Sequence, residues 1–206
     1  DFNKGIIFSS LGSFWWGFIG TYYFQYITFI GTIEVVVHRC IWTTLMLLIT
    51  TTFFNKWYLL KKIIFDKKKL LILLITSILI FGNWSIWIYA VATNRIIDAS
   101  FGYFIFPIIS VFFGFLFFNE KLNKKRIISI SLVIISTIYL FFNLNSFPWI
   151  GFSVAFLWSI YNLLRKKINV DTDIGLFIES LFIFPIAIVI FYFIFQNNMN
   201  DFSLSN

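Results

Sequence analysis

Charged residues are scarce in this chain of 206 residues: Asp, Glu, Lys and Arg together make up 12% of it, whereas hydrophobic residues make up 60%. A soluble domain is about one quarter charged. A globular core could not hide this much apolar surface, because the outside of a soluble protein still needs polar cover. The composition therefore excludes an ordinary soluble protein and predicts a protein whose main solvent is lipid.

Cysteine and histidine are almost absent. Cys40 is the only cysteine, which excludes a disulfide within the chain and leaves no cysteine cluster for a metal ion. His38 is the only histidine, and the sequence has neither a Gly-x-Ser-x-Gly nor a His-Glu-x-x-His motif, so the paired groups of membrane hydrolases are missing. A Gly-x-x-x-x-Gly-Lys loop is missing too, which argues against ATP as the direct energy source. We expect no catalytic residue, no metal and no cofactor.

Long apolar runs fill most of the chain. A membrane-spanning helix needs about 20 mostly apolar residues. Such segments occur at residues 5–26, 34–54, 70–92, 97–118, 127–143, 148–164 and 174–195. Barrel strands would be about 10 residues long with alternating polar residues, which these segments are not. The sequence predicts an all-α, polytopic membrane helix bundle with seven spans.

The basic residues gather on one side of the predicted membrane. Lys4 precedes the first span, and the loops after the second, fourth and sixth spans hold most of the 16 Lys and Arg residues. Because cytoplasmic loops carry an excess of Lys and Arg, the N-terminus is expected to be cytoplasmic. The net charge of +7 does not indicate nucleic acid, since the charges flank apolar runs and do not line one face. The expected partner is the lipid bilayer.

Two parts of the chain are similar to each other. "FSSLGSFWWG" (8–17) is followed by "FIGTIEVVVHR" (29–39), and "FSVAFLWSIY" (152–161) is followed by "DIGLFIESLFI" (173–183). Each pair joins an aromatic-rich span to an Ile-Gly sequence and a glutamate, Glu34 or Glu179. Five spans separate the equivalent elements, and an odd number places the two copies in opposite orientations. Inverted repeats with a site at their interface are a recurrent transporter design.

A five-helix repeat divides the chain unequally. Residues 1–145 would form a first repeat, and residues 146–206 would hold two of the five helices of a second repeat. The sequence therefore predicts a fragment of a ten-span protein with a 5+5 inverted-repeat architecture.

Further motifs identify a family. They are "HRCIW" (38–42), "GNWSIWIYAV" (82–91), "DASFGYFIFPIISVFFGFLFFNEKL" (98–122), "LLRKKI" (163–168) and "GLFIES" (175–180). In order and spacing the whole chain resembles EamA-type proteins of the RarD group in the drug/metabolite transporter superfamily. It departs from them at Asn119, where relatives often carry glycine, and at Phe106, where many carry asparagine. The resemblance implies a ten-helix transporter of the bacterial inner membrane that moves a small metabolite or drug-like molecule by alternating access.

The segment "EVVVHRCIW" (34–42) places three ionisable side chains in an apolar span. Glu34, His38 and Trp42 share one helical face, and Arg39 points elsewhere. One interpretation is an interfacial anchor, because Arg39 lies within reach of the outer headgroups. The other is an outer gate or proton-responsive pair formed by Glu34 and His38. In that case Arg39 would hold this span to a neighbouring helix through backbone carbonyls.

The first and third spans carry further candidates for a substrate pathway. Trp16 and Tyr23 could stack on a substrate, although most tryptophans of a membrane protein serve packing or the interface. Asn83 and Trp87 share a face of the third span. A buried asparagine needs hydrogen-bond partners, so Asn83 would either line the pathway or hold helices together.

The fourth and last spans add three candidates. Pro107 has no N–H and so leaves the carbonyl of Tyr103 free, which suits either a substrate contact or a packed kink. Glu179 lies about one turn inside the cytoplasmic end of the last span, where its alternative role is that of an interfacial acid near Arg165 and Lys166.

Together these features favour a secondary transporter whose two repeats rock about a central cavity. An integral-membrane enzyme and a non-transporting interaction or sensor protein are the alternatives. The small-molecule substrate is unknown, and both proton coupling and a homodimer stay open.

Overall fold

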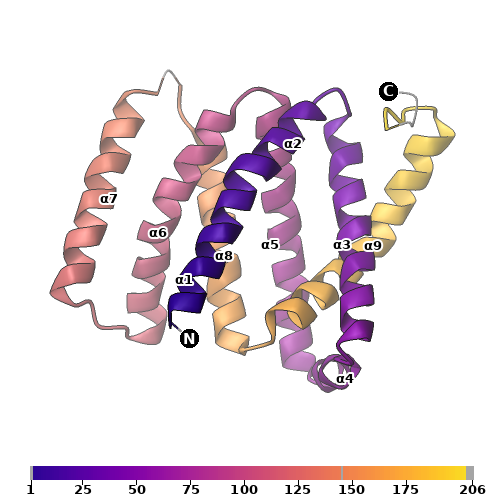
Figure 1. Cartoon of the computed structure of the whole chain (residues 1–206), viewed down its shortest axis with the longest axis horizontal. Coiled ribbons are helices and arrows are strands. Elements are labelled where there is room, and N and C mark those ends of the chain that lie inside the picture. The colour runs from indigo at the N-terminus through magenta and orange to yellow at the C-terminus, as the bar shows by residue number, and fades with distance from the viewer. Residues whose placement is uncertain (1, 145, 203–206) are drawn as a thin grey trace.

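A computed structural model describes residues 2–144 and 146–202. Every regular element in these ranges is a helix, which confirms the all-α prediction (Figure 1). The elements are α1 (Phe2–Phe14), a π-helical segment η1 (Trp15–Gly20), α2 (Thr21–Tyr26), α3 (Thr32–Phe53), α4 (Trp57–Ile64), α5 (Lys67–Ala92), α6 (Ile96–Phe118), α7 (Lys124–Phe142), α8 (Trp149–Ile168) and α9 (Thr172–Gln196).

Among the described residues, five helices are long and apolar enough to cross a membrane: α3, α5, α6, α7 and α9. They match five of the spans predicted from the sequence. The other two predicted spans, 5–26 and 148–164, are helical as well. The first is divided into three consecutive segments, α1, η1 and α2. The second corresponds to α8, which is less apolar because its last turn contains Arg165, Lys166 and Lys167. The count of seven spans therefore stays a prediction.

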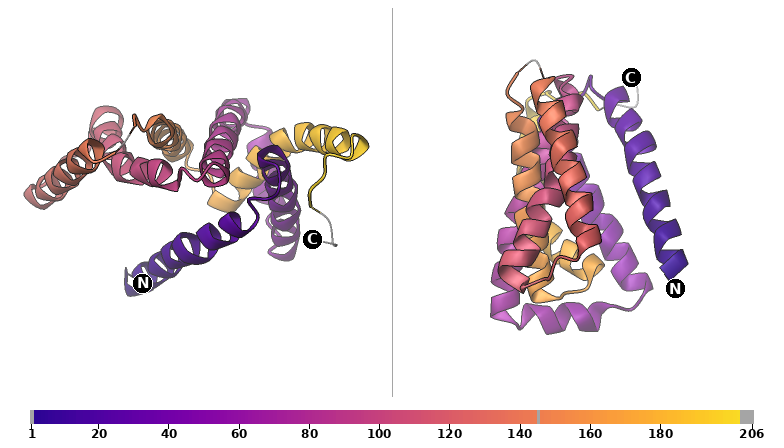
Figure 2. Two further views of the ribbon diagram at one scale, coloured as in Figure 1. Left: turned by 90° about the horizontal axis from the view of Figure 1, so that it is seen from above. Right: turned by 90° about the vertical axis from the view of Figure 1, so that its left-hand side faces the viewer.

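The first predicted span is one continuous helical rod. Phe14, Gly20 and Thr21, at the junctions of α1, η1 and α2, keep α-helical backbone angles. Figure 2 shows that this rod leans away from the other helices toward the N-terminus. Large apolar side chains such as Phe8 and Phe18 are consequently exposed along it, as suits a helix whose surroundings are lipid.

Asparagine ends most of the long helices. A residue in the left-handed region commonly terminates a helix, and asparagine tolerates that conformation better than other residues with a Cβ. Positive φ angles occur at Asn55, Asn94, Asn119, Asn169 and Asn198, next to the ends of α3, α5, α6, α8 and α9. Asn119, at φ 51°, thus adopts the conformation that glycine would otherwise supply.

The long helices run alternately up and down (Figure 1). Residues 54–66, 119–123 and 169–171 connect them at one end of the bundle, which we call the basic end because it carries the lysine-rich loops. Residues 27–31 and 93–95 and the segment after α9 lie at the other end, here the outer end. The basic loops therefore meet at a single end, as their alternation in the sequence requires.

Helix α4 lies across the basic end, roughly perpendicular to the long helices (Figures 1 and 2). It buries Leu60 and Ile63 and exposes Lys61 and Lys62. An amphipathic helix with lysines on its polar side is typical of a segment that rests at a membrane surface. The sequence alone did not separate α4 from the loop around it.

Helix α8 packs against α5 and α6, and α3 packs against α9. The closest approach is between α6 and α8, where Gly102 faces Gly151. A Cβ added to Gly102 would lie 2.5 Å from the carbonyl oxygen of Gly151, and a Cβ added to Gly151 would collide with the carbonyl oxygen of Asp98. Small residues at such crossings let membrane helices approach closely.

Candidate functional site

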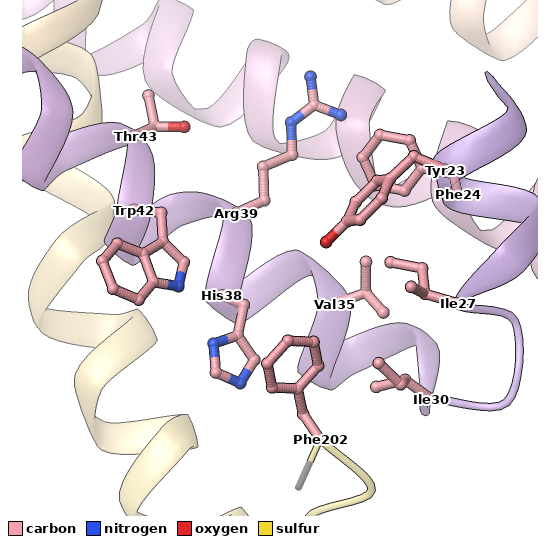
Figure 3. Close-up of a pocket in the computed structure, with 10 residues that line it drawn as sticks. All are labelled: Tyr23, Phe24, Ile27, Ile30, Val35, His38, Arg39, Trp42, Thr43 and Phe202. Atoms are coloured by element: carbon pink, nitrogen blue, oxygen red, sulfur yellow. The ribbon is translucent and has the colours of Figure 1, made fainter. Parts of the chain in front are cut away.

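A cavity of about 330 Å³ lies toward the outer end of the bundle, a volume within the usual range for small-molecule sites. It forms between α2, α3 and the segment that follows α9 (Figure 3). The residues that line it are Tyr23, Phe24, Ile27, Ile30, Val35, His38, Arg39, Trp42, Thr43 and Phe202. The structure thus brings together four of the candidates named from the sequence: Tyr23, His38, Arg39 and Trp42.

Aromatic rings surround the guanidinium of Arg39. Its Cζ atom lies 4.2 Å from the ring centroid of Trp84, 5.2 Å from that of Trp16 and 5.7 Å from that of Phe24. These are cation–π distances. Nη1 is buried and has no hydrogen-bond partner among the described residues. The sequence suggested that Arg39 would bind backbone carbonyls of a neighbouring helix, whereas the structure surrounds it with rings from η1, α2 and α5.

Glu34 and His38 lie next to each other but are not hydrogen-bonded. Their Oε1 and Nε2 atoms are 3.8 Å apart, beyond hydrogen-bond distance. The Glu34 carboxylate is 3% exposed and accepts hydrogen bonds from the backbone N–H groups of Asp201, at 2.9 Å, and Phe202, at 3.2 Å. The ring of Phe202 lies 5.0 Å from that of His38. Glu34 therefore attaches the segment after α9 to the start of α3, a contact that sequence reasoning missed.

Trp16 and Trp87, from the first and third predicted spans, are in contact. Their ring centroids are 5.2 Å apart, and Phe24 packs edge-on against Trp87 at 5.1 Å. Neither tryptophan lines the cavity itself. Trp16 contacts the guanidinium of Arg39, and Trp87 packs against Trp16 and Phe24, so these two candidates support the cavity from outside.

Asn83, Tyr103 and Pro107 are not among the residues that line the cavity. Asn83 donates a hydrogen bond of 3.0 Å to the carbonyl of Val154 and so joins α5 to α8, which favours the packing interpretation over the pathway. Tyr103 and Pro107 belong to α6, with Pro107 inside the helix, and neither is among the residues that line the cavity.

A second, more polar cavity of about 230 Å³ lies between α6 and α8 near the basic end. Phe106, Glu120 and Lys166 are among its lining residues. The hydroxyls of Ser110 and Ser159, which also line it, are buried and have no hydrogen-bond partner among the described residues. No motif in the sequence indicates this cavity, because its two walls come from helices far apart in the chain.

Glu179 is the centre of a buried polar cluster that joins three helices. It is 0% exposed. Thr76 of α5 donates a hydrogen bond of 2.6 Å to Oε1, and Tyr161 of α8 donates one of 3.0 Å to Oε2. The Nε atom of Arg165 lies 3.6 Å from Oε1. Arg165 is one of the two basic neighbours that the sequence-based alternative, an interfacial acid, named for Glu179, and the carboxylate is enclosed between helices of the bundle.

Ion pairs connect the loops of the basic end. Glu120, after α6, pairs with Lys166 of α8 and, at 3.7 Å, with Arg126 of α7. Lys56, before α4, pairs with Asp173 of α9. These charges lie outside the long apolar stretches, so they respond to the pH and salt of the solvent.

The pH dependence of the Glu120 pair can be predicted. A hydrogen bond from Lys166, followed by the charges of Lys166 and Arg126, lowers the pKa of Glu120 below its ordinary value of 4.5. The pair therefore stabilises the folded state above about pH 4.5, and that contribution is lost as the pH falls through the lowered pKa. We expect Glu120→Gln to lower the melting temperature slightly at pH 7 and not at pH 3, since exposed pairs contribute little. A melting-temperature difference that persists at pH 3 would contradict the assignment.

Comparison with known proteins gives consistent matches. The EamA-like transporter family matches residues 3–142. An uncharacterized transporter of Vibrio cholerae is 31% identical over 205 residues, which cover 100% of this chain and 68% of that protein. Protein RarD of Escherichia coli is 30% identical over 187 residues, or 91% of this chain and 63% of RarD. The uncharacterized transporter YojE of Bacillus subtilis is 31% identical over 90% of this chain and 63% of its own length.

The chain therefore spans about two thirds of the length of these relatives. No solved structure matches it significantly.

Proposed function

The chain belongs to the EamA-like transporter family, and we propose that it forms the larger part of a secondary transporter that moves a small solute by alternating access. The observation that carries this proposal is the outer cavity of about 330 Å³, which lies among helices of a multi-pass membrane bundle and is lined by aromatic side chains and the partly buried cation of Arg39. Ligand sites between helices commonly combine apolar walls with a few polar groups in this way.

We further propose that the repeats are inverted, with residues 1–145 as the first and residues 146–206 as the start of the second. The arrangement of α3 and α9 supports this. The two helices pack against each other and run in opposite directions (Figure 1). Glu34 lies in the first turn of α3 at the outer end, Glu179 lies near the start of α9 at the basic end, and both are buried. Inverted repeats place equivalent residues at opposite ends in this manner.

The proposed topology has seven spans, a cytoplasmic N-terminus and a basic end that faces the cytoplasm of a bacterial inner membrane. Its support is the concentration of lysine-rich loops at one end of the bundle, together with the preference of Lys and Arg for cytoplasmic loops. The alternative of a membrane enzyme is not proposed, because the relatives carry the names of transporters.

A flux measurement tests the proposed function. The complete protein that contains this chain would be reconstituted in liposomes, and uptake of a panel of radiolabelled small solutes would be followed. Saturable flux of at least one solute, absent from protein-free liposomes, is the expected result. Chemical conversion of a solute without flux would contradict the proposal and favour an enzyme.

We propose that Glu34 and His38 form a proton-responsive gate. Because asparagine cannot take up a proton, His38→Asn is expected to flatten the dependence of transport rate on pH. The measurement is the initial rate of flux in the same liposomes. Phe202→Leu is the matched control, because Phe202 contacts the His38 ring but does not titrate. An unchanged rate and pH profile in His38→Asn would reject the proton role.

A further inference from the structure

Arg39 differs from the other three arginines of the chain in its ionic contacts. Arg95 donates a hydrogen bond of 2.8 Å from Nε to Asp98, Arg126 lies 3.7 Å from Glu120, and Arg165 lies 3.6 Å from Glu179. No carboxylate within 4 Å of Arg39 occurs among the described residues.

The aromatic rings stabilise the charge of Arg39 but leave its hydrogen-bonding capacity unused. Trp16, Phe24 and Trp84 offer π faces to the guanidinium, and a ring face attracts a cation without replacing the oxygen acceptors of water. Nη1 is buried and has no acceptor within the described parts of the chain. Arg39 as a whole is partly buried, and a cation that is partly removed from water without an anionic partner is less stable than a fully solvated one. An incoming anion would therefore gain more here than at an exposed arginine.

The cavity beside this guanidinium provides further polar groups and apolar walls that would contact a bound solute. Arg39 is among its lining residues, and Figure 3 shows its side chain extending from α3 between Thr43 and the rings of Tyr23 and Phe24. None of the described residues that line the cavity carries a carboxylate. Apart from Arg39 and His38, the polar groups are the hydroxyls of Tyr23 and Thr43 and the indole of Trp42, and the remaining walls are Phe and aliphatic side chains.

We propose that Arg39 binds the anionic group of the solute, and that this solute is a small organic acid with one carboxylate and an apolar body. The planar guanidinium can form paired hydrogen bonds with a carboxylate, and the apolar walls would contact the body of the solute. The single cation fits one negative charge better than the two charges of a phosphate monoester. This inference rests on the proposed transport function, since it names the class of substrate for the same cavity.

A matched pair of probes tests the charge requirement directly. The protein would be placed in phosphatidylcholine nanodiscs, and the binding of radiolabelled phenylacetate and of its neutral counterpart phenylacetamide would be measured by equilibrium dialysis. We expect phenylacetate to bind at least about tenfold more tightly, because hydrogen bonds to charged groups exceed neutral ones by about that factor. Equal affinities, or no saturable binding of phenylacetate up to about 1 mM, would overturn the proposal.

Variants of Arg39 test whether this side chain causes the preference for phenylacetate over phenylacetamide. Arg39→Gln is expected to abolish the preference for phenylacetate, and Arg39→Lys to keep part of it, because lysine retains the charge without the planar donor pair. Arg126→Gln, which removes an exposed positive charge at the far end of the bundle, should leave the preference unchanged. A preference that survives Arg39→Gln would overturn the assignment. The comparison of the two probes on the unaltered protein needs no variant to fold.

Two further comparisons distinguish a failure of the proposed anion site from a failure of the proposed transport function. High salt screens the repulsion of phenylacetate by an anionic bilayer surface. If phosphatidylglycerol in the nanodisc still weakens phenylacetate binding in proportion to its content at high salt, the cavity holds a lipid headgroup and the solute proposal is wrong. Because binding is measured without transport, a clear preference for phenylacetate with no flux in liposomes would refute the transport function and leave the anion site standing. Flux of neutral solutes alone, with no preference in binding, would refute only the anion site.

Discussion

Replacing Gly151 with alanine is expected to lower the free energy of unfolding by about 3 kcal/mol, at the upper end of the usual cost of overpacking. The added Cβ would collide with the carbonyl oxygen of Asp98 and lie 3.0 Å from the backbone nitrogen of Gly102. Backbone atoms cannot move aside as a side chain can, so α6 and α8 would have to separate. Reversible unfolding in mixed detergent micelles measures the loss, and Gly151→Leu should cost more than Gly151→Ala.

Gly12→Ala provides the matched control. Gly12 lies within α1, and no atom lies within 4 Å of a Cβ added there, leaving aside chain neighbours and the backbone of its own helix. Because alanine is the better helix former, this variant should be neutral or slightly more stable. A Gly151→Ala variant as stable as the Gly12→Ala variant would contradict the close approach of α6 and α8.

The second large effect is expected at Glu179. Glu179→Leu removes the acceptor of two hydrogen bonds and leaves Arg165 without its carboxylate. Hydrogen bonds between membrane helices average only about 0.6 kcal/mol. The uncompensated charge of Arg165, whose side chain is 10% exposed, therefore decides the magnitude. Breaking one side of a buried ion pair costs about 3 kcal/mol or more, and we expect a loss of that size in the same unfolding measurement.

The double variant Glu179→Leu/Arg165→Leu identifies the cause of this loss. When both charges are removed, no unpaired ion is left in the bundle, and much of the lost stability should return. Asp66→Leu is a control at the same end of the bundle, because its partner Lys69 is one-third exposed and can be solvated. Asp66 also caps α5 by accepting a hydrogen bond from the backbone N–H of Lys69, so this control should lose about 1 kcal/mol and no more. A double variant as unstable as Glu179→Leu alone would show that the pairing of Glu179 with Arg165 does not determine the effect.

The hydropathy of the sequence was sufficient to predict the helical class and five helices with the character of membrane spans, because length and apolar content alone determine that property. It was also sufficient to predict that the lysine-rich loops alternate, which the arrangement of helices in Figure 1 reproduces. The helix ends were less predictable. The resemblance to the family led us to expect glycine at the position of Asn119, and the left-handed conformation of Asn119 supplies the helix end that glycine would otherwise supply.

Contacts between distant parts of the chain were beyond sequence reasoning. Glu34 and His38 could be assigned to one face from their spacing, but nothing in the sequence indicated that Glu34 binds the backbone of Asp201 and Phe202. The rings around Arg39 come from η1, α2 and α5, and their convergence depends on how the helices pack. Helical periodicity defines the face of a side chain, and it does not define the neighbour of that face.

The most direct test of the account is the accessibility of its loops from each side of the membrane. In a Cys40→Ala background, single cysteines would replace Lys62 and Lys124 at the basic end and Ser146 and Asn197 at the outer end, all exposed positions. A membrane-impermeant maleimide applied to intact bacteria should label the Ser146 and Asn197 variants. It should label the Lys62 and Lys124 variants only after the membrane is opened. Labelling of the Lys62 and Lys124 variants from opposite sides of the membrane would contradict the arrangement of helices on which the cavity, the repeats and the proposed transport depend.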